Sequence, residues 1–216
     1  MLEIVFVVII YFFSIVIHEV AHGTAAYILG DPTAKDAGRL TLNPISHIDP
    51  VGTVLLPLLA VFLHIPLLGW AKPVPFNPMY FKNVRRGTFI VSAAGVSLNL
   101  ILAIIFGSAI RILQTSGWGA APGGSLEPVV FIFSVVTLAN LALGLFNLIP
   151  IPPLDGSKIL FSVLGARAAG ALLFLEQWGF FILIGLIYFV PSFTRFLSLV
   201  IGGGFALLTG GAPFPF

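Results

Sequence analysis

Long apolar runs separated by short polar segments dominate the sequence. A helix needs roughly 20 residues to cross a bilayer, and five runs are long enough. They cover residues 3–29, 88–113, 128–149, 169–190 and 193–209. This pattern predicts an all-α polytopic membrane protein with about five transmembrane helices.

The segment between the first two long runs predicts additional structure. In GRLTLNP, residues 38–44, apolar and polar residues alternate, which is typical of a short β-strand. Residues 51–69 are apolar but contain two prolines, and residues 70–77 carry prolines at alternate positions, which favours an extended edge segment. We therefore expect a small β element beside the membrane, on the cytoplasmic side.

Composition requires lipid around the chain and restricts its partners. Of 216 residues, 58% are hydrophobic and 8% charged, and the mean hydropathy is +1.11, which excludes a soluble globule. The net charge of +2 includes no basic block, which excludes nucleic acid as a partner. Without repeats or long linkers, we predict one membrane-embedded domain over 1–216, with a core at about 3–160 and additional C-terminal helices at about 169–209.

Two histidines and a glutamate interrupt the first apolar run in HEVAH. His18 and His22 are four residues apart, so on a helix their side chains lie on one face. This HExxH spacing offers zinc two imidazole ligands, while Glu19 can accept a proton from a water that the metal activates. Because ionisable residues within membrane spans are costly and functional by default, we predict a zinc site rather than a chance match.

A catalytic zinc usually has three protein ligands, so a further residue must complete the site. The chain has no cysteine, which leaves His, Asp and Glu. We favour Asp155 in PPLDG, where Gly156 permits a sharp turn; its alternative role is the N-cap of a helix that begins at Ser157. The other candidates, for which loop, helix-end or turn roles are the simpler interpretation, are His47, His64, Asp49 and Asp31.

HEVAH (18–22), AGVSLN (94–99) and NLIPIPPLDG (147–156) occur in an order and spacing that resemble the site-2 protease family of intramembrane zinc metalloproteases. NPISHIDPVGT and GWAKPVPFNP are also similar to segments of its compact prokaryotic-type members, which lack a PDZ domain. The resemblance covers about residues 14–160. Val96 is a departure, because the family commonly has proline there.

The resemblance implies that His18, His22 and Asp155 hold zinc and that Glu19 is the general base. It implies cleavage within or near a transmembrane helix of a membrane protein or peptide substrate, as in regulated intramembrane proteolysis. A divalent-metal transporter is the alternative, because it too buries His and Asp near a broken helix. A homo-oligomer is compatible with the sequence, which does not fix the oligomeric state.

Two asparagines are candidates for binding the substrate backbone or the developing oxyanion. Asn140 and Asn147 are seven residues apart and share a helix face. Their alternative role is hydrogen bonding between helices, and Asn99 is interpreted as packing. Because a helical substrate must unwind before cleavage, the segments near 38–44 and 71–77 would offer an edge for strand addition.

Distance and charge predict the topology. One zinc cannot join HEVAH to PPLDG across a hydrocarbon core about 30 Å thick, so residues 51–69 must enter and return on one side. Eight of the ten Lys and Arg residues then share the side of the site, with Arg111 and Arg195 opposite, which makes that side cytoplasmic. We predict an integral multi-pass protein of a prokaryotic cell membrane with its active site toward the cytoplasm.

Overall fold

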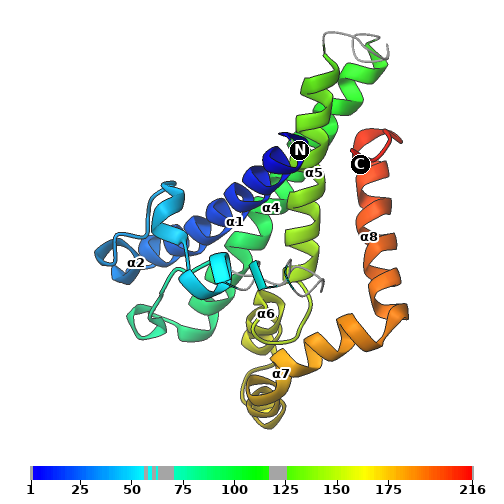
Figure 1. Cartoon of the computed structure of the whole chain (residues 1–216). Helices are drawn as coiled ribbons and strands as arrows, with labels where there is room; N and C mark the ends of the chain where they lie inside the picture. The colour runs from blue at the N-terminus through cyan, green and yellow to red at the C-terminus, as the bar shows by residue number, and fades with distance from the viewer. Residues whose placement is uncertain (1, 56–57, 60–61, 63–70, 117–125, 216) are drawn as a thin grey trace.

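The computed structural model describes residues 2–55, 58–59, 62, 71–116 and 126–215, which form helices, turns and irregular chain (Figure 1). Its long helices are α1 (Leu2–Ile28), α4 (Val84–Thr115), α5 (Glu127–Asn147), α7 (Ala169–Phe189) and α8 (Pro191–Thr209). All five are long and apolar enough to cross a membrane. The five predicted long apolar helices are therefore confirmed, because backbone polar groups surrounded by lipid must pair within a helix.

Shorter helices connect the long ones at one end of the molecule. They are α2 (Thr33–Asp36), α6 (Asp155–Leu164), the 3₁₀ helices η1 (Pro44–His47), η3 (Pro78–Tyr80) and η4 (Gly165–Ala168), and the π-helix η2 (Pro50–Leu55). Asparagine side chains start several of these elements. Asn43, Asn77 and Asn83 each accept a hydrogen bond from a backbone N–H of the first turn of η1, η3 and α4, respectively.

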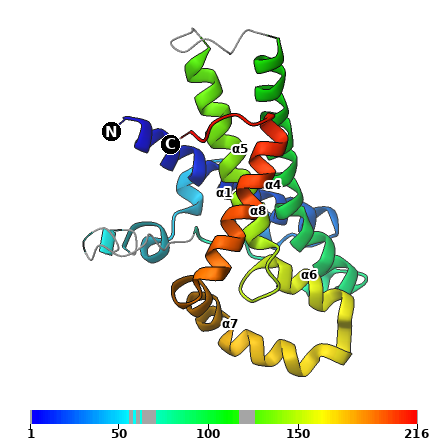
Figure 2. The same ribbon diagram turned by 90° about the vertical axis from the view of Figure 1, so that its right-hand side faces the viewer.

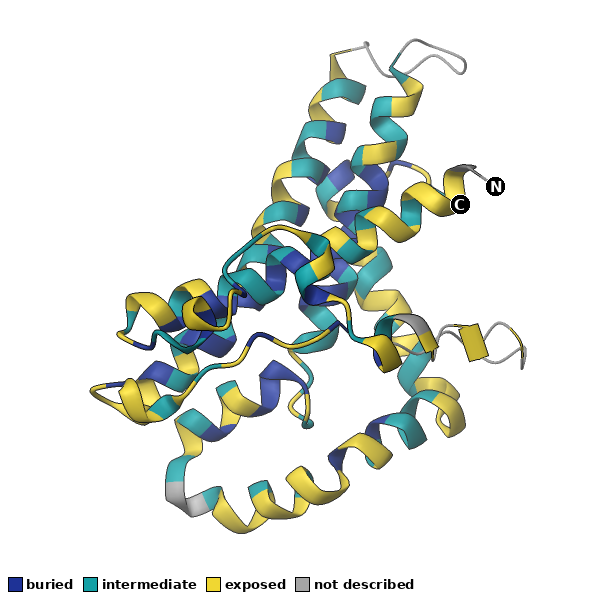
Figure 3. Cartoon of the chain, turned by 60° about the vertical axis from the view of Figure 1, so that its left-hand side comes forward, coloured by how far each residue is buried: buried dark blue, intermediate teal, exposed yellow. Residues whose placement is uncertain are grey.

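Helix α4 is the centre of the bundle and packs against α1, α5, α6 and α8 (Figures 1 and 2). Small residues allow these close contacts. A Cβ at Gly107 would lie 2.7 Å from Cβ of Leu208 in α8, and one at Gly144 in α5 would lie 2.9 Å from Cδ2 of Leu100. Such glycine contacts are typical of helices that pack within a membrane. The outward faces of the long helices are exposed, as lipid-facing surfaces are (Figure 3).

The chain returns to the end of α1 before α4 begins. The backbone N–H of Asn77 donates to Oδ2 of Asp31, just after α1, at 2.6 Å. Helices α1 and α4 are therefore antiparallel neighbours, and the connection between them starts and finishes at the same end of the bundle (Figure 1). The predicted re-entrant segment, 51–69, lies largely outside the described residues.

The predicted β element is wrong for the residues that the structure describes, where no strand occurs. Residues 38–44 form turns that lead into η1, because the Asn43 side chain caps that helix and Pro44 has no N–H for a ladder. Residues 71–77, here named the strap, are neither helix nor strand. Pro73 and Pro75 remove two of the backbone donors that strand pairing would need.

Helix α7 runs crosswise beneath the bundle rather than along it (Figures 1 and 2). Gly179 lets α7 approach the loop before α6, because a Cβ there would lie 2.6 Å from the carbonyl oxygen of Pro152. Helix α8 then begins at the α6–α7 end of the molecule and runs back along α4 and α5. Arg195, in the first turns of α8, therefore does not lie at the opposite end with Arg111, contrary to the prediction.

Candidate metal centre

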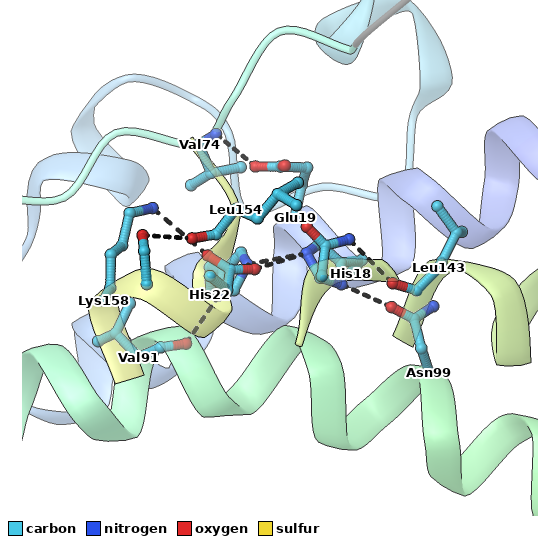
Figure 4. A network of polar contacts seen from close by, with 12 residues as sticks. His18, Glu19, His22, Val74, Val91, Asn99, Leu143, Leu154 and Lys158 are labelled. Carbon is cyan, nitrogen blue, oxygen red and sulfur yellow. Dashed lines mark hydrogen bonds and ion pairs between the residues drawn. The ribbon is translucent and has the colours of Figure 1, made fainter. Parts of the chain in front are cut away.

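Three buried side chains from two distant segments converge near the end of α1 (Figure 4). Nε2 of His18 and Nε2 of His22 lie 3.1 and 3.0 Å from Oδ2 of Asp155, the first residue of α6, and 3.0 Å from each other. Among the described residues, these form the one group of His, Asp or Glu side chains close enough to share a metal ion. The structure thus brings together the three predicted ligands.

The second nitrogen of each imidazole is bound to an oxygen of α4. Nδ1 of His22 donates to the backbone carbonyl of Val91 at 2.7 Å, and Nδ1 of His18 donates to Oδ1 of Asn99 at 2.5 Å. A neutral imidazole that donates through Nδ1 presents a lone pair at Nε2. Both rings are therefore oriented as metal ligands usually are, by a hydrogen bond on their far side.

The donor atoms fit a zinc ion. Two imidazole lone pairs and a carboxylate oxygen lie within 3.1 Å of one another, so a proton or a metal ion must supply positive charge among them. Two His and one carboxylate are a known ligand set of catalytic zinc. Gly95 of α4 makes room for the rings, because a Cβ there would lie 2.6 Å from Nε2 of His22.

Asp155 faces the histidines and does not cap a helix through its side chain. Helix α6 begins at Asp155 after Leu154, without a side-chain capping bond, so the alternative N-cap role is wrong. Burial alone would raise the pKa of the Asp155 carboxyl. When a proton rather than a metal ion occupies the cluster, hydrogen bonds from His18 and His22 and the charge of Lys158 hold that pKa below its ordinary value. Asp155 is therefore an anion at neutral pH.

Glu19 is fixed beside the ligands by the strap. Its Oε2 accepts a hydrogen bond from the backbone N–H of Val74 at 2.7 Å (Figure 4). Glu19 and the three candidate ligands line one cavity of about 130 Å³. Lys158 lines it too, with Nζ 3.3 Å from Oδ1 of Asp155. The carboxylate thus lines the same cavity as the candidate ligands, as the proton transfer predicted for it requires.

The two predicted asparagines occupy different environments. Asn147 lines the cavity, and its Nδ2 donates to the carbonyl of Leu143 in its own helix at 3.0 Å. Asn140 does not line this cavity; its Oδ1 accepts from Nδ2 of Asn99 at 2.7 Å, and its Nδ2 donates to Oγ of Ser14 at 3.0 Å. Asn140 therefore makes the interhelical hydrogen bonds that were its alternative role.

Sequence reasoning missed the contact of Asn99 with His18. Asn99 was interpreted as packing, whereas its amide joins Asn140 to the imidazole and is fully buried. The four-residue spacing of Gly95 and Asn99 places them on one helix face, but the sequence does not show that this face meets HEVAH.

The remaining ligand candidates have other partners or lie outside the description. His47 donates through Nε2 to the carbonyl of Thr41 at 2.9 Å. Asp49 accepts from the N–H groups of Val51 and Gly52, which is the turn role expected of it. Asp31 accepts from the N–H groups of Thr33 and Asn77. His64 lies outside the described residues.

The fold is a multi-pass helical bundle, and its site is a buried His, His and Asp cluster beside a glutamate. These features place the chain in the class of membrane metallopeptidases. The chain belongs to peptidase family M50, the zinc-dependent site-2 protease family. The model of this family matches residues 107–190, which include Asp155.

Named relatives agree with this membership. The chain is 41% identical over 171 residues to a Bacillus subtilis protein named "Putative zinc metalloprotease YwhC", covering 79% of this chain and 74% of the relative. It is 32% identical over 189 residues to "Putative zinc metalloprotease Rip2" of Mycolicibacterium smegmatis, covering 87% and 68%. No solved structure matches the chain.

Proposed function

We propose that this chain is an intramembrane zinc metalloprotease that hydrolyses peptide bonds in or near transmembrane segments of membrane proteins, in regulated proteolysis. The observation that carries the proposal is the convergence of His18, His22 and Asp155 beside Glu19 within an apolar helix bundle. The names of the relatives support the same activity. Zinc, when bound, supplies a Lewis acid that polarises the scissile carbonyl and acidifies a water molecule.

Residues of the chain bind the metal, transfer the proton and bind the substrate. His18, His22 and Asp155 hold the metal, and Glu19 accepts a proton from the attacking water and passes it to the leaving amine. The Val74 N–H holds Oε2 of Glu19 and thereby orients the carboxylate. Asn147, which lines the cavity, binds the substrate backbone or the developing oxyanion.

The strap receives the unwound substrate. Its backbone lies beside Glu19, and Pro73 and Val74 line the cavity. A substrate that has left its helix needs new partners for its backbone N–H groups, and the strap carbonyls can accept from them. Residues 38–44 have no such role, because they form turns.

The site faces the cytoplasmic side of a prokaryotic cell membrane. The contact between Asp31 and Asn77 supports a connection that enters and leaves on one side, as a re-entrant segment at 51–69 requires. Cationic residues lie at this same end, after α1 and around the start of α4, among them Lys35, Lys82 and Arg86. The positive-inside rule assigns that end to the cytoplasm.

A cleavage and zinc assay on the purified protein in proteoliposomes tests the proposal, with a transmembrane reporter as substrate. We expect about one zinc per chain, lost in His22→Ala and in Asp155→Ala. Glu19→Gln should keep the zinc, lose about 10²–10⁴ in rate and co-purify with uncleaved substrate. The control is Glu176→Gln, which changes an exposed acid of α7 and should cleave normally.

The same assay distinguishes the protease from the alternative, a divalent-metal transporter. Cleavage that depends on Glu19 supports the protease. Cleavage by Glu19→Gln at the wild-type rate would overturn the assigned mechanism. Zinc flux across the vesicle membrane without any cleavage would overturn the proposed function itself.

A further inference from the structure

A buried hydroxyl beside the metal centre has no hydrogen-bond partner among the residues that the structure describes. Ser92 of α4 is only 1% exposed, and its Oγ makes no hydrogen bond. Ser92 nevertheless lines the cavity that contains Glu19 and the three candidate ligands. A buried unpaired hydroxyl costs free energy, so such a group in a native structure calls for an explanation.

Three other buried hydroxyls in the long helices are paired in the usual way. Thr137, Thr209 and Ser14 each donate to the carbonyl four residues earlier, at 2.7, 2.9 and 2.9 Å. This back-bonding is the ordinary solution for Ser and Thr within a helix. Ser92 does not adopt it, which leaves its O–H free to donate to a group that enters the cavity.

The position of Ser92 places it on the metal side of α4. The preceding residue, Val91, holds His22 through its carbonyl, and Gly95, one turn later, lies against both imidazoles. Ser92 thus lies between the two α4 positions that touch the ligands. Ser92 therefore lines the same cavity as the ligands to which a scissile peptide bond must be brought.

The strap offers few donors to an extended substrate. Pro73 and Pro75 have no N–H. The N–H groups of Lys72, Val74 and Asn77 already donate to the His47 carbonyl, to Glu19 and to Asp31. Of the strap residues that line the cavity, Phe76 alone keeps an N–H without a hydrogen bond among the described residues. Most carbonyl groups of an unwound peptide therefore need donors on the other cavity walls, which Ser92, Asn147 and Lys158 supply.

We propose that Ser92 is a substrate-binding residue whose hydroxyl donates a hydrogen bond to a backbone carbonyl of the unwound substrate. The proposal rests on the proposed protease function and adds to it a specific contact on α4. The substrate is bound between an acceptor-rich strap and a donor on α4, so both kinds of backbone polar group are satisfied.

Ser92→Ala tests the contact, because it removes only the hydroxyl. We expect KM for the transmembrane reporter to rise about fivefold, the loss of one neutral hydrogen bond, with kcat changed less than twofold. Substrate affinity measured in the Glu19→Gln background should weaken by the same factor. The melting temperature should not fall, because the free protein loses no hydrogen bond. Ser14→Ala is the matched control, since the paired hydroxyl of Ser14 should be needed for thermal stability.

The outcomes separate this inference from the proposed function. A wild-type protein that cleaves nothing overturns the function and the inference together. A wild-type protein that cleaves, with unchanged KM in Ser92→Ala, overturns the inference alone. A fall in melting temperature as large as that of Ser14→Ala also overturns it, because Ser92 would then be structural. Substrate peptides in which one backbone carbonyl at a time is reduced to methylene should identify the partner of Ser92. At the partner position, the effects on KM of the reduced carbonyl and of Ser92→Ala should not add, because both remove the same hydrogen bond.

Discussion

At the scale of single residues, α4 orients the candidate ligands that α1 carries. The carbonyl of Val91 and the amide of Asn99 hold the far nitrogens of the two imidazoles, and Gly95 leaves the space that the rings occupy. The HExxH spacing predicts which residues share a helix face, but it carries no information about what packs against that face. The ligands were therefore predictable from the sequence and their supports were not.

Gly95→Ala should damage the metal centre without touching a ligand. Its methyl group would lie 2.6 Å from Nε2 of His22 and 2.8 Å from Cε1 of His18, so at least one ring must move. We expect zinc affinity to fall about 10–100-fold, measured by competition with a chelator. Gly203→Ala on α8 is the control, since a Cβ there meets nothing within 4 Å. Normal zinc affinity in Gly95→Ala would contradict the described packing.

Asn140 and Asn147 should separate zinc binding from cleavage. Asn140→Ala removes the acceptor that fixes Asn99, so we expect weaker zinc binding and a lower melting temperature. Asn147→Ala should keep its zinc and lose about 10²–10³ in rate if its amide binds the oxyanion. Zinc content and reporter cleavage, measured on the same samples, check both. Full zinc with lost cleavage in Asn140→Ala would instead make Asn140 a direct substrate contact.

At the scale of elements, the strap is held at three points and is not part of a sheet. Lys72, Val74 and Asn77 donate their backbone N–H groups to His47, Glu19 and Asp31. The prolines correctly indicated non-helical chain. They did not indicate where it would be anchored, because each anchor comes from a residue at least 25 positions earlier. The alternating pattern at 38–44 predicted a strand incorrectly, because Asn43 caps η1 and Pro44 begins it.

Asp31→Ala should release one end of the strap. It removes the acceptor of the Asn77 N–H, so we expect amide protection from hydrogen exchange at Asn77 to fall about tenfold or more. Asp36→Ala, at an exposed carboxylate of α2, is the control. Unchanged protection at Asn77 would show that the strap is held elsewhere.

Acid should release the same anchor in the unmodified protein. Burial would raise the pKa of Asp31, but hydrogen bonds from Thr33 and Asn77 outweigh burial and lower it. The folded pKa therefore lies below the unfolded value of about 3.9. The anchor stabilises the protein fully above that value and loses its contribution as the pH falls through the folded pKa. The protection factor of the Asn77 amide, which corrects for the intrinsic pH dependence of exchange, should fall over this acidic range, and a constant protection factor would contradict the assignment.

At the scale of the whole molecule, the long helices were predictable from the sequence, but the direction of each helix was not. Apolar length alone identifies the five long helices, because backbone polar groups in lipid must pair within a helix. Length does not tell a crossing helix from one that lies across the end of a bundle, as α7 does (Figure 2). Contacts such as that of Gly179 with Pro152 decide the matter, and they are tertiary.

Single cysteines on this cysteine-free chain should reveal the two ends of the bundle. Lys35→Cys and Arg86→Cys should label from the same side of sealed vesicles, because α1 ends and α4 begins together. Arg111→Cys should label from the opposite side. Arg195→Cys should label with Lys35→Cys, because α8 begins at the α6–α7 end (Figure 1). Labelling of Arg195→Cys with Arg111→Cys would show that α7 crosses the membrane.

The chain of contacts from Ser14 through Asn140 and Asn99 to His18 also has a consequence for biogenesis. Its members come from α1, α4 and α5, which leave the ribosome in that order. Until α5 is inserted, Asn99 lies in lipid without the Asn140 acceptor, so the first two helices alone form an incomplete pair. Arrival of α5 completes the network that orients His18, and only then does the loop after α5 deliver Asp155. The candidate metal centre is thereby completed only after α1, α4 and α5, the helices whose side chains line it, have been made.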